Sequence, residues 1–124
     1  MNRRTSFWAT AVAFGFLSVG AAIAAEQPHS IIHVITVKWK DDATEDQINK
    51  AIRGAEQLAK DYPGIQRIWT KTLKVQGKGY KNAIVMEFAN EDAFKKYADS
   101  PAQKKWYEVY MPIREESTTH DITN

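Results

Sequence analysis

The chain has 124 residues, with 17 basic and 15 acidic side chains, a formal net charge of +2, and no cysteine. The absence of cysteine excludes disulfide bonds, and it also excludes a lipoprotein anchor, which needs an acylated cysteine. A net charge this small gives no general reason to expect nucleic acid or an anionic membrane as a partner.

The first 25 residues have the pattern of a signal peptide. Two arginines near the start precede a mostly apolar stretch over residues 7–20, and Ala22-Ile23-Ala24 offers the small-x-small pattern of a cleavage site. We expect cleavage after Ala24 or Ala25, export to the periplasm or the extracellular space, and no membrane association afterwards. The alternative is an uncleaved anchor, because the apolar stretch is just long enough to span a bilayer. Cleavage would remove both arginines and leave 15 residues of each charge.

The remaining chain has the length of one domain. We expect residues 26–30 to be a leader, residues 31–122 the domain and residues 123–124 a tail. About 100 residues bury only a modest core, and no disulfide supports it, so association into a homodimer is a common way to add buried area.

Residues 31–40 are a β-branched run that contains one histidine. Alternation places Ile31, His33, Ile35, Val37 and Trp39 on one face, which is apolar enough to face a core. A histidine in such company either has a hydrogen-bond partner or is poised for chemistry.

A helix is predicted over residues 45–61, because apolar residues recur at helical spacing and Thr44 with Gln47 fits a capping box. Residues 65–75 are typical of a second strand, residues 76–82 of a hairpin loop, and residues 83–88 of a central strand that is apolar on both faces apart from one glutamate.

Two further helices and a last strand follow. Asn90 is expected to cap a short helix that carries Tyr97. Ser100 is expected to cap the next helix, with Gln103 closing a capping box and Pro112 marking the end. Residues 117–122 are polar and β-branched, which is compatible with an edge strand.

The predicted order is strand, helix, strand, strand, helix, strand. This is the α+β, ferredoxin-like βαββαβ arrangement, with a four-stranded antiparallel sheet and helices on one face. The other face would carry Ile32, Val34, Thr36 and Lys38, with Val85 and Glu87, and it is too apolar to be left to water. A second copy of the chain is the expected cover.

With these elements placed, the chain resembles the stress-responsive dimeric α/β-barrel family, Dabb. The resemblance covers nearly the whole domain and depends on several motifs together: residues 33–40, residues 42–48, Gly79-Tyr80, and residues 97–103. It implies two ferredoxin-like subunits that pair sheet to sheet into a shared barrel. Most members have no assigned chemistry, but plant polyketide cyclases of the family work without metal or organic cofactor, in a pocket between sheet and helices.

The resemblance also implies site residues. His33, Tyr97 and Asp121 match positions that carry catalysis or surround it. Pocket walls are expected at Ile35, Val37, Ile52, Ile84, Met86, Gln103 and Arg114. The histidine that serves the cyclases as general base is replaced here by Gln103, whose carboxamide has no useful basicity.

His33 therefore has three interpretations. It is a core histidine satisfied by Asp121 or a backbone carbonyl, a general base oriented by Asp121 and assisted by Tyr97, or a metal ligand together with His29 and His120. The metal interpretation lacks tight ligand spacing, so no metal or other cofactor is predicted.

Two function classes follow. The first is a non-catalytic exported homodimer that binds a small apolar or aromatic molecule, and Gln103 favours it. The alternative is a cofactor-independent enzyme, either a cyclase-like lyase or an oxygenase, that uses His33 with Tyr97.

Overall fold

The computed structural model describes Val12, Ala13, Gly15 and residues 25–124. The predicted signal peptide, residues 1–25, therefore lies almost entirely outside the described residues. Within the part of the chain that is described, no helix is long and apolar enough to cross a membrane.

The helices and strands follow one another along the chain as β1 (Ile31–Trp39), α1 (Glu45–Asp61), β2 (Ile65–Trp69), β3 (Asn82–Phe88), α2 (Glu91–Tyr97), α3 (Pro101–Tyr110), a 3-10 turn (Met111–Ile113) and β4 (Arg114–Ile122).

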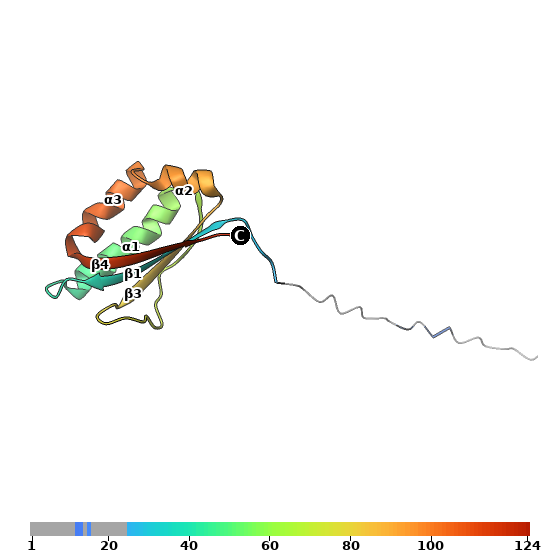
Figure 1. The fold of residues 1–124 in the computed structure, drawn as a ribbon, viewed down its shortest axis with the longest axis horizontal. Coiled ribbons are helices and arrows are strands. Elements are labelled where there is room, and N and C mark those ends of the chain that lie inside the picture. Colours follow the sequence, from blue (N-terminus) through green and yellow to red (C-terminus); the bar gives the residue numbers. More distant parts are fainter. Residues whose placement is uncertain (1–11, 14, 16–24) are drawn as a thin grey trace, which may run out of the picture.

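The four strands form one antiparallel sheet in the order β2-β3-β1-β4. The helices α1, α2 and α3 lie on one side of this sheet, and no helix or strand of the described residues covers its other side (Figure 1). The predicted ferredoxin-like fold is confirmed, and so is the central position of β3. The last strand lies beside the first, so β4 forms one edge of the sheet and β2 the other.

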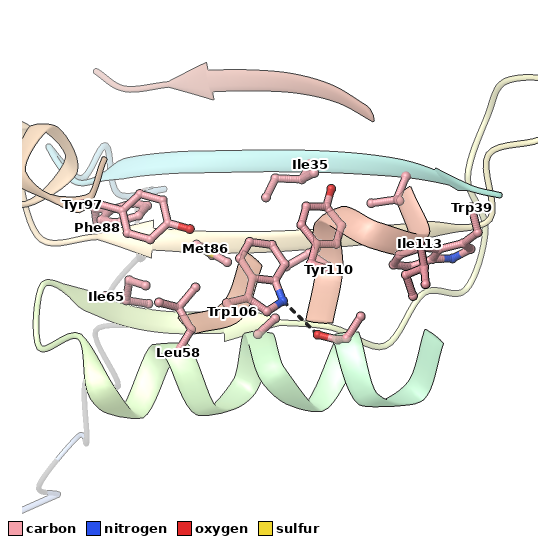
Figure 2. Packing of buried hydrophobic residues seen from close by; sticks show 14 of the residues in the cluster. Ile35, Trp39, Leu58, Ile65, Met86, Phe88, Tyr97, Trp106, Tyr110 and Ile113 are labelled. Carbon is pink, nitrogen blue, oxygen red and sulfur yellow. Dashed lines mark hydrogen bonds between the residues drawn. The ribbon is translucent and has the colours of Figure 1, made fainter. Parts of the chain in front are cut away.

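The core lies between the sheet and the helices (Figure 2). Ile31, Ile35, Val37 and Trp39 are all buried, which confirms the face predicted for the first strand. Because side chains alternate along a strand, His33 points to the same side. Most of the rest of the core comes from β3, α1 and α3, and single residues come from β2, α2 and the 3-10 turn. Its members include Ile84, Met86, Phe88, Ala51, Ala55, Leu58, Trp106, Tyr110, Ile65, Tyr97 and Ile113.

The predicted helix caps are present, with one difference. Thr44 and Gln47 form the full capping box, and the side chains of Asn90 and Ser100 accept hydrogen bonds from the third residues of their helices. Gln103, however, does not close a box on Ser100. Its carboxamide oxygen accepts from the backbone N–H of Asp99, at 2.7 Å. Asp99 has a φ of 61°, and this left-handed turn brings its N–H toward the helix.

Three strand boundaries differ from the sequence prediction, one of them by a single residue, since β3 begins at Asn82 instead of residue 83. β2 ends at Trp69 instead of continuing to residue 75, because the hydroxyl of Thr72 both donates to the carbonyl of Ala83 and accepts from its N–H. That side chain takes the place of the next rung of backbone hydrogen bonds. The loop therefore covers residues 70–81, and β4 begins at Arg114 instead of residue 117.

We call the side of the sheet away from the helices the open face. Its apolar residues are Ile32, Val34, Trp69, Val85 and Ile122, which register places on four neighbouring strands. Trp69 and Ile122 are exposed, and the side chains between them are half-buried. An apolar stripe across a whole sheet is typical of a surface that another protein covers.

One ion pair crosses the open face. Arg67 donates from Nε and Nη2 to the two carboxylate oxygens of Glu87, at 2.6 Å and 2.8 Å. The hydrogen bond from Arg67 lowers the pKa of Glu87, although burial opposes the shift. The pair therefore keeps a buried carboxylate ionised next to Ile32 and Val85, and its bidentate geometry gives both oxygens a hydrogen bond.

Candidate functional site

A cavity of about 260 Å³ lies between the β1–β4 side of the sheet and the helices α2 and α3. Its wall is largely aromatic, and it includes two cations but no carboxylate. The lining residues are His33, Ile35, Phe94, Lys95, Tyr97, Ala98, Gln103, Trp106, Tyr107, Tyr110, Arg114, Ser117 and Thr119. Strand β4 forms the open edge of the sheet, so the cavity lies beneath an edge strand and two short helices.

His33 lies in this wall with its partner on the next strand. Register places it directly opposite Asp121, and its Nδ1 is hydrogen-bonded to the Asp121 carboxylate. Because an ionised carboxylate only accepts, Nδ1 carries the hydrogen and Nε2 is the nitrogen that can take a proton. The His33 side chain is 13% exposed. Phe88, Phe94 and Tyr97 surround its ring, with centroids 5.7–6.3 Å away.

Tyr97 and Tyr110 bring two buried hydroxyls to the cavity. Tyr97 is 4% exposed and Tyr110 is 1% exposed, and neither hydroxyl has a hydrogen-bond partner among the described residues. In Figure 2 both hydroxyls lie in the layer between the helices and the sheet, and that of Tyr110 is directed toward β1. Burial raises the pKa of both phenols, so each stays protonated at neutral pH and can donate.

Both polar atoms of the Gln103 carboxamide form hydrogen bonds within the protein. Besides accepting from Asp99, it donates from Nε2 to the hydroxyl of Tyr107, at 3.1 Å. The side chain thus joins the α2–α3 turn to the second turn of α3. It lines the cavity as predicted, but its polar atoms are already paired.

Of the other predicted pocket residues, some line the cavity and some do not. Ile35 and Arg114 line the cavity with Gln103, whereas Val37, Ile84 and Met86 are fully buried in the core and do not line it. Ile52 on α1 is only half-buried and also lies outside it. Val37, Ile84 and Met86 are covered by the helices, so no space is left above these three.

Several lining residues were not predicted. Phe94, Lys95, Tyr107, Tyr110 and Ser117 all contribute to the wall. The spacing of Gln103, Tyr107 and Tyr110 places them on one side of α3, and this was the signal in the sequence that could have found two of them.

The metal interpretation of His33 does not fit the geometry. His120 pairs with Val34 in the register of β1 and β4, so it lies on the open face, whereas His33 faces the helices. His29 is hydrogen-bonded to the backbone of Asn124. Across the described residues, no three His, Cys, Asp or Glu side chains come close enough together to hold a metal ion.

Solved structures of the same fold include proteins with and without a known activity. A dimeric protein of unknown function with a ferredoxin-like fold, from Bacteroides fragilis, is 20% identical with a TM-score of 0.67 over 80% of this chain and 100% of that one. A Dabb family protein from Mesorhizobium loti is 18% identical, with a TM-score of 0.65 over 77% and 96%. A hydroxynitrile lyase from Passiflora edulis is 17% identical, with a TM-score of 0.69 over 77% and 93%.

At this level of identity, the similarity shows a shared fold and no shared activity. No functionally curated protein matches the chain. A family model, however, covers nearly the whole domain, because the Stress responsive A/B Barrel Domain, Dabb, matches residues 31–124. The chain therefore belongs to the Dabb family.

Proposed function

We propose that this chain is an exported, homodimeric Dabb protein that binds a small apolar or aromatic molecule in the cavity and does not transform it. The observation that carries the proposal is the aromatic-walled cavity, with the hydroxyls of two of its lining residues, Tyr97 and Tyr110, buried beside it without a partner among the described residues. Buried polar groups are nearly always hydrogen-bonded, and a bound molecule would complete these two.

The size and wall of the cavity support a small ligand. Its volume of about 260 Å³ is just under the roughly 300–1,000 Å³ typical of pockets for drug-sized molecules. The flat faces of Phe94, Trp106 and Tyr107 suit an aromatic ring, since aromatic pairs favour stacked and edge-on contacts.

Export and dimerisation rest on other features. The signal-peptide pattern over residues 1–25 supports export to the periplasm or beyond, and the mass of the mature protein tests it, because an intact chain would contradict cleavage. The apolar open face supports a homodimer, and the Bacteroides fragilis structure of the same fold is dimeric.

A ligand screen by thermal shift on the mature protein tests the binding proposal. A specific ligand at about 100 times its dissociation constant should add about 2.7 kcal/mol of apparent stability, because it binds only the folded state. Thr119→Trp, on the cavity wall, should abolish the shift by filling the space. Glu115→Trp is the matched control, since Glu115 is an exposed residue of the same strand that does not line the cavity. A shift that survives Thr119→Trp would place the ligand elsewhere.

The second candidate is a cofactor-independent enzyme, and the His33–Asp121 pair favours it. The pair leaves Nε2 of His33 free to accept a proton, in the wall that also holds Tyr97. A carboxylate that fixes the tautomer of a histidine is a recurring feature of general bases. The hydroxynitrile lyase of the same fold makes carbon–carbon cleavage in a cyanohydrin a reasonable first assay.

His33→Ala separates the two candidates. If His33 is a general base, the variant should release cyanide from an aromatic hydroxynitrile about 10²–10⁴-fold more slowly than the unmodified protein. The folded dimer should persist, since His33 makes no backbone-ladder contact through its side chain. Equal rates in the two proteins would reject His33 as the base, and the absence of turnover in the unmodified protein would reject the lyase.

A further inference from the structure

The cavity has an unusual balance of charge. Lys95 from α2 and Arg114 from β4 line it, while no carboxylate does. Within the described part of the chain, neither cation forms an ion pair. A cleft lined by one sign of charge concentrates ligands of the opposite sign. The field inside this cavity therefore favours an anion, although the mature chain as a whole is formally neutral.

Arg114 is held in position without being neutralised. Its guanidinium carbon lies 5.4 Å from the centroid of the Tyr110 ring, and its Nη1 donates to Oγ of Ser117, at 3.2 Å. Both partners are uncharged, so the positive charge and most of the N–H groups of the fork remain available. A half-buried guanidinium that is fixed by a ring and a hydroxyl loses little freedom when it binds an anion.

Tyr110 offers a second donor at the same end of the cavity. The ring that lies under Arg114 ends in a hydroxyl with no partner among the described residues, in a side chain that is almost fully buried. At the other end, Phe94 and Tyr97 lie against His33 and form an aromatic compartment. The space thus has Arg114 and Tyr110 at one end and, at the other, an aromatic compartment beside Lys95 of α2.

We infer that the cavity binds an aromatic carboxylate, with the carboxylate on Arg114 and the Tyr110 hydroxyl and the ring toward His33. A planar carboxylate matches the guanidinium fork with two parallel hydrogen bonds, and the volume suits one or two fused rings. This inference rests on the proposed function, since it names the ligand class of the same cavity.

Isothermal titration of 2-naphthoate and 2-naphthamide tests the inference, because the two probes differ in charge and hardly in shape. The unmodified protein should bind naphthoate at least about tenfold more tightly than naphthamide. Arg114→Gln should bring this ratio to about one, while Arg114→Lys, which keeps the charge, should retain part of it. Lys104→Gln, an exposed residue of α3 outside the cavity, is the control and should leave the ratio unchanged.

Tyr110→Phe removes only the hydroxyl and provides a second test that does not depend on Arg114 packing. It should weaken naphthoate binding severalfold and spare naphthamide. Equal binding of both probes by the unmodified protein would overturn the carboxylate inference and leave the proposed function intact. Failure of both probes to bind would overturn the two together. A charge preference that survives Arg114→Gln would show that Arg114 is not the anchor.

Discussion

Replacing Trp106 by alanine is expected to lower the free energy of unfolding by about 3–5 kcal/mol. Trp106 is 2% exposed, stacks on Tyr110 with ring centroids 4.3 Å apart, and donates from Nε1 to the carbonyl of Ala51, at 2.9 Å (Figure 2). It is thus the main link between α3 and α1. The truncation would create a hollow and remove a side-chain hydrogen bond to the Ala51 carbonyl, which keeps its backbone partner within α1. Denaturant unfolding at a fixed protomer concentration measures the loss.

Trp106→Phe separates the two parts of this effect. Phenylalanine keeps a ring over Tyr110 and loses the N–H, so we expect a smaller cost of about 0.5–1.5 kcal/mol, which reflects the lost hydrogen bond to the Ala51 carbonyl. If Trp106→Ala cost no more than Trp106→Phe, packing between the helices would not stabilise the fold as the structure indicates. Trp106 also lines the cavity, so the same variants should weaken ligand binding.

The parts of the fold that local sequence determines were predictable. The alternation in β1 selects its buried face, and the Thr44–Gln47 box places the start of α1, because both depend on residues close together in the chain. The order of elements then leaves few topologies, of which the ferredoxin-like fold is one.

Interactions between distant residues set the rest. β2 ends early because the Thr72 side chain replaces the backbone ladder at Ala83, and a strand propensity cannot reveal that exchange. Gln103 binds Asp99 instead of capping Ser100 because Asp99 adopts a left-handed turn, which the sequence pattern does not specify.

The candidate site was predictable where topology alone brings residues together. The neighbouring first and last strands make the His33–Asp121 contact foreseeable. The extent of the cavity was not, because it depends on how α3 packs against α1, to which it is joined by the Trp106–Ala51 hydrogen bond, and against the sheet. In this packing Tyr107 and Tyr110 line the wall, whereas Val37 and Met86 are covered.

The second large effect is expected on the open face. The unmodified protein should have the mass of a dimer at micromolar concentration, and Val34→Glu should raise the dissociation constant at least about 100-fold. Val34 lies between Val85 and His120 in the register, at the centre of the apolar stripe. A two-fold dimer would bury two such carboxylates, and an unpaired buried charge costs more than the roughly 1–3 kcal/mol of an unpaired polar group. Sedimentation analysis over a concentration series gives both constants.

Asn49→Glu provides the matched control, because it adds the same charge at an exposed position of α1, on the helix side of the sheet. It should leave the dimer intact. Val34 is half-buried in the single chain, so the glutamate can reach water there, and the Val34→Glu monomer should keep its circular dichroism spectrum. An unmodified protein that is monomeric at micromolar concentration would contradict the dimer. A Val34→Glu protein that stays dimeric would show that the two copies meet through another surface, and that the open face needs a different cover.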